Sequence, residues 1–344
     1  MKSPAWRFRA ARRPDILPRV SIRPPILIVL ALFLCAGCEP IEEPTGFRVA
    51  LLTPGSIRDG GWNQSAYEGL KRIEGDLAAA VAHQETATPQ DREAGFRDFA
   101  ARGYDLVFGH GFEFQDAAAL VAAQYPDTVF VTTSGETVAP NLAPIVFELE
   151  QATYVLGFVG ARLSRTGQLG AVGGIEVPSV ASTFFAFQKG AERGRADVRV
   201  SISYTGSWTD VSAAREATLA QIAQGVDVLI HNANEGARGF FQAVRDSDGV
   251  FAYGSNRNQN DQAPERVLAS ATLDVPEALL LVAREVLEDR FEPRSIRFGL
   301  AQGVIGIGWN PALESAIEPD LRAEADALVA SIVAGEFSVP RGEF

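Results

Sequence analysis

The first residues that could do chemistry lie in a glycine-rich loop that holds an aromatic ring. Residues 54–64 read PGSIRDGGWNQ, so Trp62 and Asn63 directly follow two glycines. Glycine lets the backbone bend tightly, and Asn63 is a residue type that caps the helix expected next. A planar ring such as a nucleobase stacks on an exposed indole with a gain of about 1–3 kcal/mol. From these residues alone, packing of Trp62 under its own loop is an equally good interpretation.

A second loop of this kind surrounds a histidine. Residues 109–114 read GHGFEF, which places His110 between two glycines and Phe112 at the start of an expected helix. His110 can donate a hydrogen bond to a ligand, or its ring nitrogens can satisfy the loop itself. In isolation the second interpretation is favoured, and we keep His110 and Phe112 as candidate ligand-binding residues.

A third loop combines amides with a carboxylate. Residues 232–236 read NANEG, so Asn232, Asn234 and Glu235 come directly after an apolar run and before an expected helix. Three polar side chains are more than one helix cap needs. Amides offer both donors and acceptors, which suits the edge of a purine. These three residues are therefore candidate ligand contacts.

The fourth loop is the most polar of the set. Residues 255–261 read SNRNQND and contain Asn256 and Arg257 close to the end of another apolar run. A solvated loop is the alternative interpretation. We take Asn256 and Arg257 as candidate ligand-binding residues on the same edge as the other three loops.

Regular alternation of short apolar runs and amphipathic segments must position these loops. The expected strands are residues 48–53, 80–85, 106–109, 128–132, 169–173, 198–204, 226–231, 250–254 and 267–270. The expected helices are residues 63–79, 90–101, 114–125, 154–163, 180–192, 212–224, 236–245 and 276–289.

This alternation predicts an α/β protein with parallel sheets covered by helices on both faces. The rhythm restarts near residue 154 without a linker, which indicates two doubly wound lobes side by side. Ligands bind at the carboxyl ends of the strands in such sheets. The four loops all follow strands, so we expect them to line a ligand cleft between the lobes.

Composition and charge exclude several classes of function. Residues 1–37 hold seven of the 31 Lys and Arg and one of the 43 Asp and Glu, so the remainder has a net charge of −18. So acidic a chain is a poor partner for nucleic acid or an anionic membrane surface. Three histidines and a body without cysteine leave little material for a transition-metal site. No G-x-S-x-G or P-loop motif is present, and we expect no enzyme activity, no metal and no cofactor.

The N-terminus is typical of an export signal. Its basic region precedes an apolar run at residues 26–34, about half of what a membrane-spanning helix needs. The run ends in Cys35-Ala36-Gly37-Cys38, which predicts a signal peptide at residues 1–37 and lipidation of Cys38. Ordinary secretion with cleavage near Ala36 is the alternative. Residues 38–45 are rich in Pro and Glu and are expected to form a tether.

At its loops the sequence resembles the basic membrane protein family of periplasmic lipoproteins, the purine nucleoside-binding receptors of ABC transporters. The resemblance covers about residues 47–339. Its motifs are Trp62-Asn63-Gln64 with Glu68-Gly69, residues 108–112 with 125–127, residues 170–174, and residues 254–259, which correspond to the family's F-N-x…E-G, G-x-G-F…(Y/F)-P-D, G-x-V-G-G and G-x-D-x-D-Q.

The resemblance implies the type I periplasmic binding protein fold, in which the chain crosses between lobes several times. We place lobe 1 at residues 46–150 and 274–302, and lobe 2 at residues 151–273 and 303–344. It also implies capture of a purine nucleoside, a nucleobase or a similar planar heterocycle for an ABC importer. The protein would be anchored by lipid at the periplasmic face of a bacterial membrane. A sensory receptor of the same fold is the first alternative, and a secreted nucleoside hydrolase is the second.

Three departures from the family pattern concern the sugar of the ligand. Asn256 stands where nucleoside-binding members have an aspartate, and Leu273 stands near their lysine. Pro54 replaces the acidic residue usual after the first strand. The aromatic stacking position is kept as Trp62. The resemblance therefore implies a preserved base half and a rebuilt sugar half of the site.

Overall fold

The computed structural model describes residues 46–343, and Gly46–Phe344 forms one compact unit. The predicted signal peptide, Cys38 and the tether lie outside the described residues. Within the described range, no helix has the length and apolar character needed to cross a membrane.

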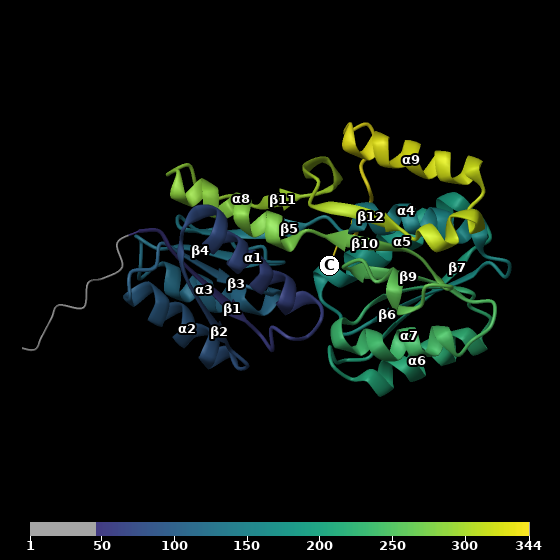
Figure 1. The fold of residues 1–344 in the computed structure, drawn as a ribbon, viewed down its shortest axis with the longest axis horizontal. Helices are drawn as coiled ribbons and strands as arrows, with labels where there is room; N and C mark the ends of the chain where they lie inside the picture. Colours follow the sequence, from purple (N-terminus) through teal and green to yellow (C-terminus); the bar gives the residue numbers. More distant parts are fainter. Residues whose placement is uncertain (1–45, 344) are drawn as a thin grey trace, which may run out of the picture. The chain divides into compact units, whose positions relative to one another are not determined.

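The first sheet has six strands, all parallel, in the order β11-β5-β4-β3-β1-β2. Helices α1 and α8 cover one face and α2 and α3 the other (Figure 1). We call this part lobe 1. Its elements are β1 (Arg48–Thr53), α1 (Trp62–Leu77), β2 (Ala80–Glu85), α2 (Pro89–Ala101), β3 (Leu106–Gly109), η1 (Phe112–Phe114), α3 (Gln115–Ala122), β4 (Val129–Thr133), β5 (Leu142–Phe147), α8 (Val275–Leu287) and β11 (Ile296–Phe298).

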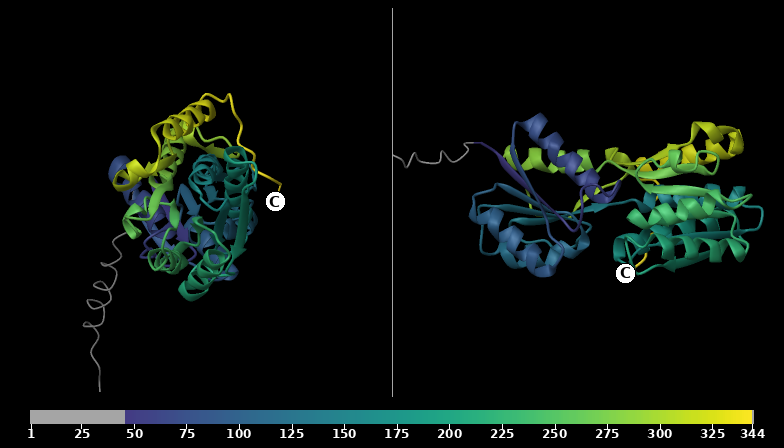
Figure 2. Two further views of the ribbon diagram at one scale, coloured as in Figure 1. Left: turned by 90° about the vertical axis from the view of Figure 1, so that its right-hand side faces the viewer. Right: turned by 60° about the horizontal axis from the view of Figure 1, so that its bottom comes forward.

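The second sheet, in lobe 2, has the order β12-β10-β9-β8-β6-β7, and only β12 runs antiparallel to its neighbour. Helices α4 and α5 pack together on one face and α6 and α7 on the other (Figures 1 and 2). The elements are α4 (Glu150–Leu163), β6 (Gln168–Gly173), α5 (Pro178–Gly194), β7 (Arg199–Tyr204), α6 (Val211–Ala223), β8 (Val228–Asn232), η2 (Asn234–Gly236), α7 (Ala237–Arg245), β9 (Phe251–Asn256), η3 (Asn260–Gln262), β10 (Val267–Leu273), β12 (Ile305–Trp309), η5 (Pro311–Ala316) and α9 (Pro319–Val333).

Local sequence explains the two-sided burial of the sheets. Strands β3 and β5 are buried at every position, as a parallel sheet covered on both faces requires. Helices α4 and α5 approach closely because Gly157 and Gly190 have no side chain. A Cβ on Gly157 would lie 2.0 Å from the carbonyl oxygen of Phe187, and one on Gly190 would lie 1.9 Å from that of Tyr154.

Three chain segments pass between the two sheets, after β5, after β10 and after β11. Backbone hydrogen bonds hold them together: the Glu148 amide donates to the Phe298 carbonyl at 2.8 Å, and the Asp274 amide to the Val304 carbonyl at 2.7 Å. The predicted α/β architecture of two doubly wound lobes is confirmed. The residue bounds given above for the lobes remain our proposal.

Four elements were missed by the sequence analysis: β5, β11, β12 and α9. Strand β5 contains Pro144, which lacks an amide donor, and β12 alternates glycine with larger residues. β11 has only three residues. The proline of β5, the glycines of β12 and the shortness of β11 are the reasons why these strands were not recognised.

Candidate functional site

Loops at the carboxyl ends of the strands meet between the two sheets. The amide of Trp62, at the start of α1, donates to Asn234 Oδ1 at a long 3.4 Å. Gly61 allows this approach, because a Cβ there would lie 2.8 Å from the same oxygen. The first and third predicted loops, 172 residues apart, are thus in direct contact.

The ring of Trp62 is held by two other aromatic groups of lobe 1. It stacks on His110 with ring centroids 4.0 Å apart and an interplanar angle of 23°. Phe147, at the end of β5, meets it edge-on at 6.0 Å. The indole remains partly exposed. Its orientation is therefore fixed by packing within lobe 1.

The structure places His110 differently from its predicted role as a ligand contact. The side chain is fully buried. Its Nε2 lies 3.1 Å from the Trp62 carbonyl, and its Nδ1 lies 3.1 Å from Thr133 Oγ1. A carbonyl only accepts, so Nε2 carries the proton and Nδ1 accepts from the threonine. Burial lowers the pKa of His110 to about 3, against the raising effect of its bond to Trp62. Both nitrogens are used, so His110 supports the indole from beneath.

Asn63 also differs from the expectation, because it lies inside α1 and does not cap it. The carboxylate of Asp59 takes that role: it accepts from the amides of Gly61, Asn63 and Gln64 at 2.9, 2.8 and 3.0 Å. A carboxylate satisfies several free amides of a first turn better than one amide oxygen can. Asn63 is freed by this arrangement, and its buried Oδ1 has no hydrogen-bond partner.

Phe112 begins the short helix η1 and is partly exposed. The residue two positions later, Phe114, is fully buried and packs edge-on against Phe96 at 6.0 Å. The predicted aromatic loop therefore divides its two rings between the surface and the core.

The amide residues of lobe 2 form a connected group. Asn256 Nδ2 donates to Asn232 Oδ1 at 3.2 Å, which links the ends of β9 and β8. Asn256 and Asn234 have φ of 69° and 49°, a left-handed conformation that asparagine tolerates better than most residues. Glu235 is partly exposed in η2, next to Asn234. Tertiary structure thus brings together three of the predicted amides from two loops.

A buried hydrogen-bond network supports the fourth loop from below. Gln259 Oε1 lies 2.9 Å from the Ser255 amide and 2.9 Å from His231 Nε2, so both nitrogens donate to it. Burial lowers the pKa of His231 to about 4. The backbone amide of Gln259 in turn donates to Ser270 Oγ at 3.0 Å. The conformation of the loop is therefore fixed by β8 and β10.

Arg257 reaches across to lobe 1. Its Nη2 lies 3.6 Å from Glu68 Oε1 on α1, and Gln64 Nε2 donates to the same oxygen at 2.8 Å. Arg257 Nη1 is buried and has no acceptor. This arginine is thus held by one nitrogen and free at the other.

Trp208, which the sequence analysis did not select, belongs to the same region of lobe 2. Its ring lies against Gly174, where a Cβ would come within 2.3 Å of it. The Gly174 amide donates to the Asn232 carbonyl at 2.9 Å. Trp208 lies in the glycine-containing loop after β7, so the rule that selected Trp62 would have found it.

Leu273, near the lysine position of the family pattern, is buried at the end of β10. Asp274 follows it and caps α8 by accepting from the Glu277 amide at 2.9 Å. Neither side chain can take the place of the lysine that the resemblance implies here.

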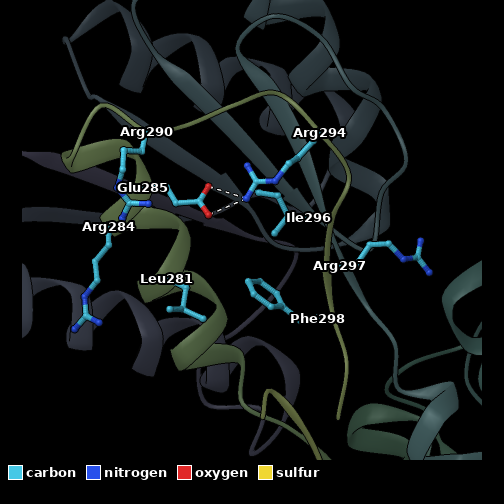
Figure 3. A pocket seen from close by; sticks show the side chains of 8 residues that line it. All are labelled: Leu281, Arg284, Glu285, Arg290, Arg294, Ile296, Arg297 and Phe298. Carbon is cyan, nitrogen blue, oxygen red and sulfur yellow. Dashed lines mark hydrogen bonds and ion pairs between the residues drawn. The ribbon is translucent and has the colours of Figure 1, made fainter. Parts of the chain in front are cut away.

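Two cavities lie away from these loops. One of about 440 Å³ is in lobe 1 and is lined by Leu281, Arg284, Glu285, Arg290, Arg294, Ile296, Arg297 and Phe298 (Figure 3). Another of about 790 Å³ lies between β12, η5 and α9. In the first cavity, Glu285 accepts from Arg294 at 2.8 and 3.0 Å, so the charge of Arg294 is already neutralised. Neither cavity contains a residue of the four loops.

Comparison with solved structures defines the class by its fold. An ABC transporter solute-binding protein from Aeropyrum pernix has a TM-score of 0.78 at 22% identity, over 86% of this chain and 94% of that chain. The two sheets are those of a periplasmic binding protein.

Residues 47–343 match the family described as ABC transporter substrate-binding protein PnrA-like, and the chain belongs to this family. The resemblance predicted from the loop motifs is thereby confirmed. Basic membrane protein A of Borreliella burgdorferi is 29% identical over 92% of this chain and 94% of its own length. A purine-binding protein of Brucella abortus is 25% identical over 91% and 88%.

Proposed function

We propose that this protein captures a purine-like solute between its two lobes and delivers it to an ABC importer. The single observation that carries the proposal is the partly exposed indole of Trp62, oriented by His110 and Phe147 and joined through its amide to Asn234 of the other lobe. Such an arrangement offers a flat apolar face next to amide groups that match a heterocycle's edge. The name of the Brucella abortus relative supports a purine.

The base would stack on Trp62, and Trp208 would offer a second aromatic face from lobe 2. Asn63 Oδ1, buried without a partner, is an acceptor for a ring N–H. Asn232 and Asn234 would meet the remaining polar edge of the base, and Asn256 would lie on the sugar side of the ligand. Contacts to both lobes would favour the state in which the lobes are together, by a hinge motion at the three crossing segments.

The test is to denature the purified mature protein and identify any released small molecule by mass spectrometry. Isothermal titration of protein refolded without ligand, with purine bases and nucleosides, then gives affinities. A released purine, or a dissociation constant in the micromolar range or below, supports the proposal. A panel in which no purine or nucleoside binds would refute it. Conversion of a nucleoside to base and sugar during the titration would favour the hydrolase.

Anchoring by lipid at Cys38 is part of the same proposal and places the protein at the periplasmic face of a membrane. Two export signals, the apolar run and the small residues before Cys38, support it. Cys38→Ser should abolish labelling with a radioactive or clickable fatty acid while leaving the folded domain intact. Unchanged labelling would contradict the anchor without affecting the ligand proposal.

A further inference from the structure

The unsatisfied nitrogen of Arg257 distinguishes it from other arginines of the protein. In the cavity of Figure 3, Arg294 donates one Nη to both Glu285 oxygens and the other to the Glu292 carbonyl at 3.0 Å. Among residues 46–343, the other buried arginine nitrogens without an acceptor are Nε atoms, and Arg257 supplies the one terminal Nη. A buried donor without an acceptor is costly, and a charged donor more so. A ligand that accepts a hydrogen bond from this nitrogen would remove that cost.

Neighbouring contacts place Arg257 between α1 of lobe 1 and the fourth loop of lobe 2. Nη2 lies near Glu68 on α1, and the backbone is set by Asn256 before it, whose amide is bonded to Asn232. The preceding residues of the loop, Ser255 and Asn256, carry no acid. The guanidinium is therefore paired with Glu68 at Nη2 and has no acceptor at Nη1, in a residue that directly follows Asn256.

Resting on the proposed function, we infer that Arg257 recognises an acceptor edge and makes this a receptor for 6-oxopurines in preference to 6-aminopurines. A guanidinium offers donors only. A 6-oxopurine presents its exocyclic oxygen, an acceptor that the free Nη1 can meet, whereas adenine has an amino donor at that position.

The asparagines of the site do not make this distinction. Each amide has both a donor and an acceptor and can rotate to suit either type of base. Arg257 cannot exchange its donors for acceptors, so the discrimination depends on this residue. One hydrogen bond from a charged donor to this oxygen, absent with adenine, discriminates by about 10- to 150-fold.

Hypoxanthine and adenine test the inference, since they differ at position 6 and in the adjoining ring proton. Calorimetric titration of the mature protein should give hypoxanthine an affinity at least about 10-fold higher than that of adenine. Arg257→Gln should remove the preference, because glutamine both donates and accepts. Arg257→Lys should keep only part of it, since an ammonium is a single point of charge. Thermal melts of each variant would establish that it is folded.

Arg266→Gln is the matched control. Arg266 lies just before β10, at its amino end, and pairs with Asp248 at 3.3 Å, away from the four loops. This variant should keep the wild-type ratio. Adenine binding as tightly as hypoxanthine, or a preference that persists in Arg257→Gln, would overturn the inference and leave the proposed function standing. If neither base nor any nucleoside binds, the proposed function itself fails.

Discussion

The two halves of the candidate site are built on different physical principles. In lobe 1, Trp62 is positioned by ring packing on His110 and Phe147, and the imidazole nitrogens are satisfied within the protein. In lobe 2, Asn232 and Asn256 are positioned by hydrogen bonds between loops. Packing forces depend little on chemical identity, whereas hydrogen bonds depend on it strongly. The aromatic half should therefore supply affinity and the amide half selectivity.

The two halves share one feature: each is supported by a buried neutral histidine, His110 or His231. Burial lowers their pKa values to about 3 and about 4, from an unfolded value near 6.5. Both folded pKa values are depressed, so their stability contribution is complete above pH 6.5 and is lost as pH falls, down to about 4 for His231 and about 3 for His110. At pH 5 the free energy of unfolding should be lower by about 2 kcal/mol for each of these two histidines. Half-buried His83 also has a lowered pKa and acts in the same direction.

Urea denaturation at pH 7 and pH 5 measures this effect. In His110→Gln and in His231→Gln, the free energy of unfolding should fall less between pH 7 and pH 5 than in the wild type, because one buried neutral histidine is gone. A free energy of unfolding that stays constant between these pH values in the wild-type protein would show that neither histidine is buried in its neutral form.

Trp62→Ala tests whether affinity comes from the aromatic half. Removing the indole should weaken binding of a purine by about 5- to 150-fold, which corresponds to about 1–3 kcal/mol of lost stacking. Trp62→Phe should retain much of the affinity, because a smaller ring still stacks. Titration calorimetry is the measurement, with Trp309→Phe as a control at a tryptophan near α9. An unchanged dissociation constant in Trp62→Ala would mean that the indole serves only to pack its own loop.

Asn256→Asp tests selectivity in the amide half and has the smallest expected effect. A ribose diol is held best by an ionised carboxylate, and a charge-assisted bond is roughly twice as strong as a neutral one. We expect the wild-type protein to bind a free base at least as tightly as its nucleoside. Asn256→Asp should shift this ratio a few-fold toward the nucleoside.

Titration of hypoxanthine and of inosine into the wild type and into Asn256→Asp gives the ratio of the two affinities for each protein. Inosine bound more than tenfold tighter by the wild type would show that ribose recognition survives by other residues. Arg257, Asn258 and Glu235 are then the nearest charged and amide candidates in sequence.

Much of the fold could be predicted from the sequence because its signals are local. Apolar runs such as that of β1 and the amphipathic segments between them predict parallel strands and covering helices without knowledge of any contact. Since parallel strands of one sheet end at one edge, the loops that carry Asn232 and Asn256 could be placed together in advance. The family resemblance depended on the same loops.

Only the tertiary structure decided how those residues are used. Phe147 comes from a strand that the sequence pattern did not reveal, and it fixes the indole of Trp62 together with His110. Arg257 meets Glu68 across 189 residues of sequence. Periodicity along the chain reports which face of an element is buried, but it carries no information about which distant side chain fills the space opposite. That choice is made by packing and hydrogen bonding, and it separates a supporting histidine from an arginine with a free donor.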